Sequence, residues 1–137
     1  MSGSIAHDPP DPGAAELKGV SILLVEDSWH LGKAMKRLLL TLGAEVVGPA
    51  ATTVDAERMA AERNPDIAIV DINLRHGERS NNLIDQLLEQ HVSVIIVTGY
   101  AAVSLPTQKV EAILEKPLSK ERLLEELRRI IARRMDG

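Results

Sequence analysis

The 137-residue chain contains no cysteine and no phenylalanine, and it has only one tryptophan and one tyrosine. Without cysteine, the chain can form neither a disulfide nor a zinc site with thiolate ligands, and this composition suits a reducing cytoplasm. With so few aromatic side chains, the core must be built from aliphatic residues.

Long apolar runs and a strong charge of either sign are also missing. No apolar run approaches the roughly 18 residues that a membrane span requires, and the N-terminus lacks the basic-then-apolar order of a signal peptide. The net charge of −4 gives no electrostatic reason to expect nucleic acid or an anionic membrane as a partner. These absences predict a cytoplasmic protein whose partners are metal ions and basic protein faces.

The length of the chain is sufficient for one domain with an ordinary core. Residues 1–18 include the run Asp-Pro-Pro-Asp-Pro-Gly at positions 8–13, which offers little to bury and predicts a flexible leader. The domain itself is predicted to span residues 19–135. Only Met135-Asp136-Gly137 follows the last predicted helix, so we expect no attached DNA-binding or catalytic output domain.

Apolar runs and helical spacings alternate along this domain. The apolar, β-prone runs predict strands at residues 21–25, 44–47, 66–71, 92–97 and 112–114. Leucine spacing and capping residues predict four helices: one from Ser28 to Gly43, two at residues 54–63 and 82–90, and one after Ser119. Residues 101–110 are too few for a full helix with two loops, so this crossover helix is short, irregular or absent. The alternation predicts an α/β fold with right-handed crossovers and a doubly wound, five-stranded parallel sheet.

Polar residues follow four of these strands at their carboxyl ends, namely Glu26 and Asp27, then Asp71, then Thr98, then Lys116. Ligands bind at this edge in open α/β sheets, so these side chains are expected to converge. Three carboxylates placed together repel one another unless a cation lies between them. A hard divalent ion meets that need. Mg2+ would take Asp27, Asp71 and a backbone carbonyl such as that of Asn73 as ligands, with Glu26 acting through water.

The same edge provides what phosphoryl transfer needs, which is mainly positioning and charge neutralisation. Asp71 is predicted to accept the phosphoryl group. The Lys116 ammonium can meet one phosphoryl oxygen and the Thr98 hydroxyl can donate to another. Gly99 leaves room for the group to enter, because a side chain there would crowd the site. Lys116 is followed by Pro117, which favours a fixed backbone and permits a cis peptide bond.

These residues resemble the receiver domain of two-component response regulators. The likeness covers residues 20–134 and rests on the acids after the first strand, Asp71, Thr98 and Lys116-Pro117. It implies a flavodoxin-like fold with strand order 2-1-3-4-5. It also implies that Asp71 takes a phosphoryl group from a kinase histidine, with Mg2+ held by Asp27, Asp71 and the Asn73 carbonyl, while Thr98 and Lys116 hold the phosphoryl oxygens.

The chain departs from the common family pattern in two places. Ile113 stands where the family often carries an aromatic switch residue, and the stretch from Thr98 to Lys116 is short. Both departures, with residues 77–80 and Thr98-Gly99-Tyr100, resemble a subgroup of stand-alone receivers that pair with sensor kinases of the HWE type in alphaproteobacteria. The fuller subgroup motif, Pro-Phe-x-Phe-Ala-Thr-Gly-Tyr, is met only in part. If the subgroup holds, Tyr100 is the residue that reports phosphorylation.

The resemblance implies a single-domain response regulator. It would receive phosphate from a sensor histidine kinase, then bind a target protein or return the phosphate through a histidine phosphotransfer protein, with no enzymatic activity beyond its own phosphorylation and dephosphorylation. Trp29 is expected at the rim of the site, either partly exposed or limiting the access of water to the acyl phosphate.

Two other functions compete with this hypothesis. A phosphatase of the haloacid dehalogenase type also uses an aspartate after a parallel strand with Mg2+, but it needs a second acid two residues on, where this chain has Asn73. A pseudo-receiver would bind partners without taking phosphate. All the expected acids are present, which argues against it, whereas the altered switch region favours it.

Overall fold

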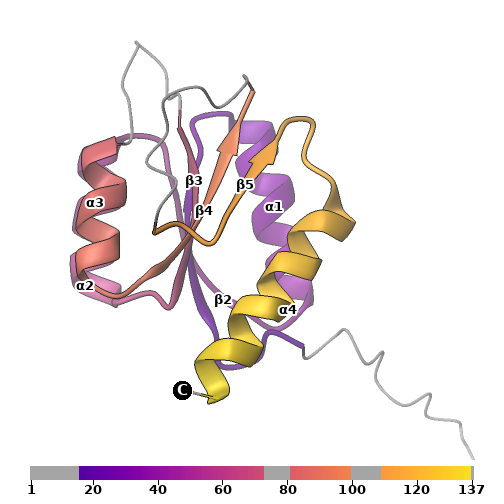
Figure 1. Ribbon diagram of the computed structural model, residues 1–137. Helices are drawn as coiled ribbons and strands as arrows, with labels where there is room; N and C mark the ends of the chain where they lie inside the picture. Colours follow the sequence, from indigo (N-terminus) through magenta and orange to yellow (C-terminus); the bar gives the residue numbers. More distant parts are fainter. Residues whose placement is uncertain (1–15, 73–80, 100–108, 137) are drawn as a thin grey trace, which may run out of the picture.

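The computed structural model describes residues 16–72, 81–99 and 109–136 (Figure 1). Within them, five strands form one sheet in the order β2-β1-β3-β4-β5, and all four neighbouring pairs are parallel. The predicted α/β fold and the strand order 2-1-3-4-5 are therefore confirmed. No helix in the described ranges combines the length and apolarity that crossing a bilayer requires.

Four of the five strands lie within about one residue of their predicted positions. The strands are β1 (Ser21–Val25), β2 (Glu45–Ala50), β3 (Ile67–Asp71), β4 (Ser93–Thr98) and β5 (Ala112–Glu115). The prediction for β2 was wrong at its end, because the strand continues through Gly48 and Pro49 to Ala50 instead of stopping at Val47. It can do so because β2 is an edge strand, where a proline without an amide donor is tolerated.

The helices begin and end at the residues that favour those positions. They are α1 (Trp29–Thr41), α2 (Thr53–Arg63), α3 (Asn81–Glu89) and α4 (Lys120–Asp136). The hydroxyls of Ser28, Thr52 and Ser119 accept hydrogen bonds from backbone amides in the first turns of α1, α2 and α4. The short crossover helix predicted at residues 101–110 falls almost entirely outside the described residues.

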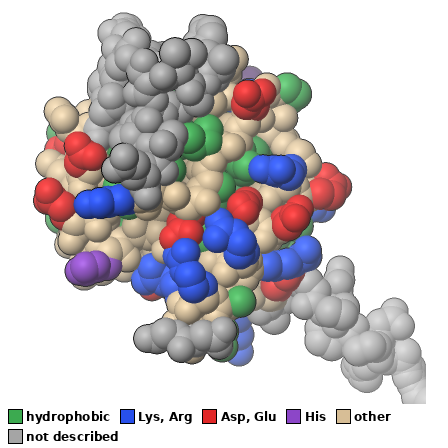
Figure 2. Space-filling view, viewed as in Figure 1, with side chains coloured by type: hydrophobic (Ala, Val, Ile, Leu, Met, Phe, Trp, Pro, Cys, Tyr) green, Lys and Arg blue, Asp and Glu red, His purple; other side chains and the backbone are tan. Residues whose placement is uncertain are grey.

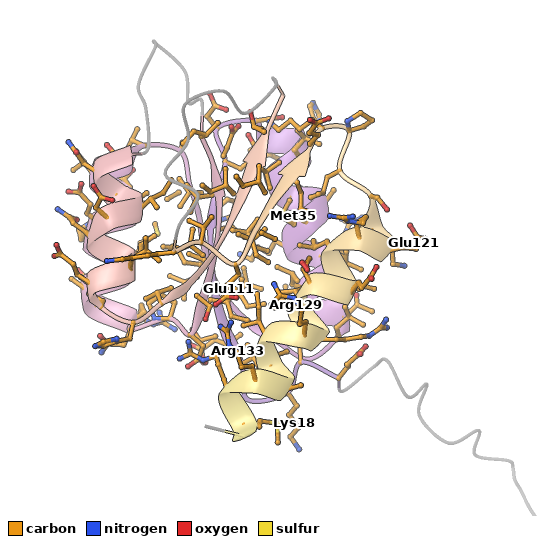
Figure 3. The ribbon with its side chains drawn as sticks, viewed as in Figure 1. Lys18, Met35, Glu111, Glu121, Arg129 and Arg133 are labelled. Carbon is orange, nitrogen blue, oxygen red and sulfur yellow. The ribbon has the colours of Figure 1, made fainter. Side chains whose placement is uncertain are left out.

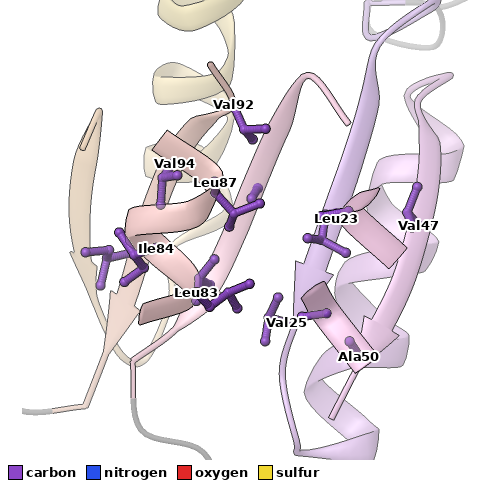
Figure 4. Packing of buried hydrophobic residues seen from close by; sticks show 14 of the residues in the cluster. Leu23, Val25, Val47, Ala50, Leu83, Ile84, Leu87, Val92 and Val94 are labelled. Atoms are coloured by element: carbon purple, nitrogen blue, oxygen red, sulfur yellow. The ribbon is translucent and has the colours of Figure 1, made fainter. Parts of the chain in front are cut away.

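Helices cover both faces of the sheet. In Figure 1, α1 and α4 lie on one face, and α2 and α3 lie on the other. Figure 4 shows the second layer, in which Ile84 and Leu87 of α3 lie near Val92 and Val94, and Leu23 and Val25 of β1 belong to the same buried cluster. Every residue of β3 and of β4 is buried. The central strands therefore hold the residues at their carboxyl ends in fixed places.

Ion pairs tie α4 to the rest of the domain. Figure 2 shows basic and acidic side chains intermixed on the face that carries α4. Arg129 and Arg133 of α4 both reach Glu111, which lies just before β5 (Figure 3), and Arg128 pairs with Glu16. Pairs of this kind contribute little to stability, and α4 packs on the sheet mainly through its buried residues Leu123, Leu127 and Ile130.

Glu16 and Leu17, which the sequence placed in the leader, contact the domain. Leu17 is fully buried between the sheet, α1 and α4, and its amide donates to the carbonyl of Leu42 at 2.8 Å. Nothing in the sequence near Leu17 shows a periodic pattern that would indicate this burial. The packed part of the chain therefore includes Glu16.

Replacing Leu17 with alanine is expected to lower the free energy of unfolding by about 2–5 kcal/mol, because it leaves a cavity in the core. Urea unfolding followed by circular dichroism measures the change. Lys18→Ala is the matched control, since Lys18 is exposed, and it should change stability by less than about 0.5 kcal/mol. Equal effects of the two substitutions would contradict the burial of Leu17.

Candidate functional site

The site lies at the carboxyl edge of the sheet, where β1, β3, β4 and β5 end. Asp71 is the last residue of β3 and is only 4% exposed. Thr98 ends β4, is also buried, and its carbonyl accepts a hydrogen bond from the Lys116 amide at 2.8 Å. Lys116 follows β5, and its peptide bond to Pro117 is cis. The backbone of this loop is thus held directly against the end of β4.

Lys116 forms ion pairs with two acids, one after β1 and one at the end of β3. Its Nζ lies 2.9 Å from Oδ2 of Asp71 and 3.3 Å from Oε1 of Glu26. The other oxygen of Glu26 accepts a hydrogen bond from the Ser28 amide at 3.1 Å. A single ammonium group therefore compensates two buried carboxylates, which would otherwise lie close together without a counter-charge.

The three acids form a group of the size that a metal ion needs. One carboxylate oxygen from each of Glu26, Asp27 and Asp71 lies within 4.8 Å of the others. Opposite ligands of an octahedral Mg2+ are about 4.2 Å apart, because each Mg–O distance is about 2.1 Å. Oxygen ligands also match the preference of Mg2+. These residues fit the ion with little change in position, and an acid slightly too distant can reach it through water.

Burial and nearby charges shift the pKa values of two groups in the site. Burial raises the pKa of Glu26 above its ordinary value of 4.5, and the neighbouring charge of Asp71 raises it further, although the Ser28 amide and Lys116 act in the opposite direction. Burial alone would lower the pKa of Lys116, but its hydrogen bond to Asp71 and the two carboxylates raise it above 10.5. Lys116 is therefore fully charged at neutral pH.

The raised pKa of Glu26 predicts a pH dependence of stability. The folded chain binds the Glu26 proton more tightly than the unfolded chain does, so this group stabilises the fold in acid, and that contribution is lost as the pH rises from about 4.5 through the raised pKa. In the absence of metal, Glu26→Gln is expected to reduce this fall in the free energy of unfolding. Urea unfolding in EDTA at several pH values between about 4.5 and 7 measures it.

The exposed residue Glu89 offers the control, since Glu89→Gln should leave the slope as it is in the wild type. If Glu26→Gln leaves the slope of the unfolding free energy against pH unchanged, this pH dependence does not come from Glu26.

The roles predicted for four other residues are not shown by the structure. Trp29 is 65% exposed and lies under the Nζ of Lys33, 4.5 Å from the ring centroid; a role in excluding water stays a prediction. A Cβ on Gly99 would meet no described atom within 4 Å, so the described residues do not support the expectation that a side chain there would crowd the site. Asn73 and Tyr100 lie outside the described residues, so their proposed roles stay predictions.

The contribution of β2 to the site could not be predicted from the sequence. The carbonyl of Ala50 accepts a hydrogen bond from the Glu26 amide at 2.9 Å, so the end of β2 supports the start of the acidic loop. The strand was predicted to end before this residue. A Gly-Pro pair is a signal for a turn, and only the pairing with β1 shows that the strand continues past it.

A comparison with family models identifies the class of protein. Residues 22–132 match the model of the response regulator receiver domain. The chain therefore belongs to the family of response regulator receiver domains, as the sequence motifs predicted.

Individual relatives are larger than this chain. The phyllosphere-induced regulator PhyR of Methylorubrum extorquens is 30% identical over 121 residues, which cover 83% of this chain and 45% of PhyR. The transcriptional regulatory protein DesR of Bacillus subtilis is 31% identical over 119 residues, which cover 86% of this chain and 59% of DesR. This chain thus spans about half the length of the curated relatives that it matches. The crystal structure of PhyR from Brucella abortus superimposes with a TM-score of 0.77 at 19% identity, over 90% of this chain and 53% of that chain, which is a likeness of fold.

Proposed function

We propose that this receiver domain accepts a phosphoryl group on Asp71 from a phosphohistidine donor in the cytoplasm, with Mg2+, and passes the signal on by contact with another protein. The observation that supports this most directly is the pairing of Asp71 with Lys116 at 2.9 Å inside a group of three acids. A buried carboxylate with a mobile cation beside it and space for a second cation can both attack phosphorus and tolerate the charge that arrives.

The reaction moves one phosphoryl group between two side chains. An oxygen of Asp71 would attack the phosphorus, the P–N bond to the donor imidazole breaks, and the imidazole keeps the electron pair and takes a proton. Asp27, Asp71 and, through water, Glu26 would hold the ion, as would the carbonyl of Asn73. When bound, Mg2+ neutralises charge on the phosphoryl oxygens.

Lys116 and Thr98 complete the site. The Lys116 ammonium already lies between Asp71 and Glu26, so it can turn from Glu26 to a phosphoryl oxygen without leaving the site. The Thr98 hydroxyl would donate to another oxygen. These groups act by position and charge, and the transfer needs no separate protein base.

The surface of α1 supports contact with a protein donor. The helix carries Lys33, Lys36 and Arg37 and no acid, although the chain as a whole has a net charge of −4. Trp29, Leu31 and Leu40 are exposed on it. Between α1 and α4 lies a groove of about 610 Å³ that reaches Gly99 and Lys116 and is lined mostly by apolar side chains. Lys33, Lys36 and Arg37 do not line this groove and gather on another part of α1. The apolar groove, which reaches Lys116, would take an apolar face of the phosphoryl donor, and the basic part of α1 would take acidic residues of the same donor.

The finer assignment is to the subgroup of stand-alone receivers with sensor kinases of the HWE type. Ile113 in place of an aromatic switch residue, and Thr98 followed by Gly99 and Tyr100, support it. In this subgroup, Tyr100 would respond to the phosphoryl group, and the chain would either bind a target or exchange phosphate with a histidine phosphotransfer protein. Output by protein contact requires no chemistry beyond phosphorylation and dephosphorylation of Asp71.

The test is to incubate the wild-type chain with phosphoramidate, a small donor with the P–N bond of phosphohistidine, with and without Mg2+. One phosphoryl group per chain is expected by intact mass, only with Mg2+, and it should be lost in mild base as acyl phosphates are. Beryllium fluoride with Mg2+ should shift the NMR amide signals of Thr98 and Tyr100. The absence of both labelling and amide shifts would favour a pseudo-receiver. Turnover of a phosphate ester would favour a phosphatase.

A further inference from the structure

A bulge in β2 lies against the loop that carries Glu26 and Asp27. From Leu23 to Val25, β1 advances by two residues, whereas their partners in β2, Val47 and Ala50, are three residues apart. The extra residue changes the register of the strand pair. As a result, the Ala50 carbonyl meets the Glu26 amide at 2.9 Å, and the backbone of the first acid is tied to the edge strand.

Gly48 makes this bulge possible. Its φ is +95°, a conformation that favours glycine, and a Cβ there would lie 2.8 Å from the Leu24 carbonyl oxygen and 2.8 Å from the Ala50 nitrogen. Both contacts are with backbone atoms that cannot move aside. The path of β2 through Gly48 therefore brings the ring of Pro49 toward α1.

The Pro49 ring packs closely against Gly32. Gly32 is buried in the first turns of α1, and a Cβ on it would lie 3.0 Å from Cγ of Pro49 and 3.9 Å from Cγ of Glu26. Glycine is a poor residue for the interior of a helix, and the close approach of Pro49 accounts for it here. The Gly32 amide donates to the Ser28 carbonyl at 2.9 Å. A shift of Gly32 would thus move the start of α1.

The start of α1 is in turn bonded to the acidic loop. The Ser28 amide holds Oε2 of Glu26, and the backbone of Glu26 is held by Ala50. Two connections from β2 therefore meet at the acids, one through the Ala50 carbonyl and one through Pro49, Gly32 and Ser28. The geometry points to Gly32 and Pro49 as positioning residues that set the place of Glu26 and Asp27 for Mg2+, an inference that rests on the proposed function.

The decisive variant is Gly32→Ala, studied by calorimetric titration with Mg2+ and by urea unfolding. The added methyl must push against Pro49, so the Mg2+ dissociation constant is expected to rise roughly tenfold, as when a residue that supports metal ligands is changed. Stability should change little, because the better helix propensity of alanine offsets part of the cost of its close contact with Pro49. Without metal, the NMR amide signals of Glu26, Asp27 and Ser28 should also shift.

Ala34→Gly is the matched control, because it changes helix propensity at an exposed position of the same helix and should leave the Mg2+ affinity unchanged. The double variant Gly32→Ala, Pro49→Ala removes the ring carbon nearest to the new methyl, and its affinity should return toward that of Pro49→Ala alone. Additive losses would mean that the two residues act independently and would overturn the inference.

The Mg2+ titrations also distinguish a failure of the positioning role from a failure of the proposed function. A Gly32→Ala protein that binds Mg2+ within about twofold of the wild type, a difference of about 0.4 kcal/mol, overturns the positioning role and leaves the proposed function intact. A wild-type chain that does not bind Mg2+ instead overturns the proposed function. If Gly32→Ala does not fold, Pro49→Ala decides, since it loosens the same contact and must weaken Mg2+ binding if the inference holds.

Discussion

Replacing Asp71 with asparagine is expected to abolish phosphorylation by phosphoramidate. The amide has almost the same size as the carboxylate, so the end of β3 keeps its packing, but its oxygen is too weak a nucleophile to attack phosphorus. The substitution also removes the carboxylate charge that lies 2.9 Å from the Lys116 ammonium. Intact mass after incubation with the donor and Mg2+ should show the unmodified chain only, while the wild type gains one phosphoryl group.

Asp66→Asn is the control for this experiment. Asp66 precedes β3 at the opposite edge of the sheet, where its Oδ2 accepts a hydrogen bond from the Ser21 amide at 2.9 Å. It is an aspartate beside the same strand, but it lies far from the acidic group, and its replacement should leave labelling as in the wild type. Labelling of the Asp71→Asn chain would show that another residue, such as Asp27, accepts the phosphoryl group.

The sequence was sufficient to predict how the strands bring the site together. Strands β3 and β4 are buried along their whole length, and such strands appear in the sequence as unbroken apolar runs that end at a polar residue. Because parallel strands present their carboxyl ends at one edge, the topology alone brings Glu26 near Asp71 and Lys116, residues 45 and 90 positions away from it (71 − 26 and 116 − 26).

What the sequence could not show depends on pairing between distant segments. The bulge of β2 exists only because Gly48 and Pro49 lie against β1 and α1, whereas in the sequence the same pair reads as a turn. Leu17 is a single apolar residue after a polar leader, and its burial follows from the space between α1 and α4. Neither feature has a local pattern, so only the packed structure reveals it.

Lys116→Met is expected to separate metal binding from phosphoryl transfer. The ammonium lies within 3.3 Å of both Glu26 and Asp71, so it neutralises carboxylates that the ion also needs. Removing this charge should leave Mg2+ affinity unchanged or tighter. The rate of phosphorylation should still fall about 100-fold, the usual order for the loss of one charged donor to the transferred group. Calorimetry with Mg2+ and the time course of labelling measure the two effects.

Asp27→Asn is the matched variant, and it should show the opposite pattern. It removes one carboxylate of the acidic group, so Mg2+ binding should weaken by at least tenfold, as changes near metal ligands commonly do. Its labelling should recover when the Mg2+ concentration is raised, because Lys116 and Asp71 are still in place. The labelling of Lys116→Met should not recover, since its loss does not arise from metal binding. Recovery of both variants at high Mg2+ would mean that Lys116 acts only by helping the ion to bind, and the role of its ammonium in holding the phosphoryl group would then be wrong.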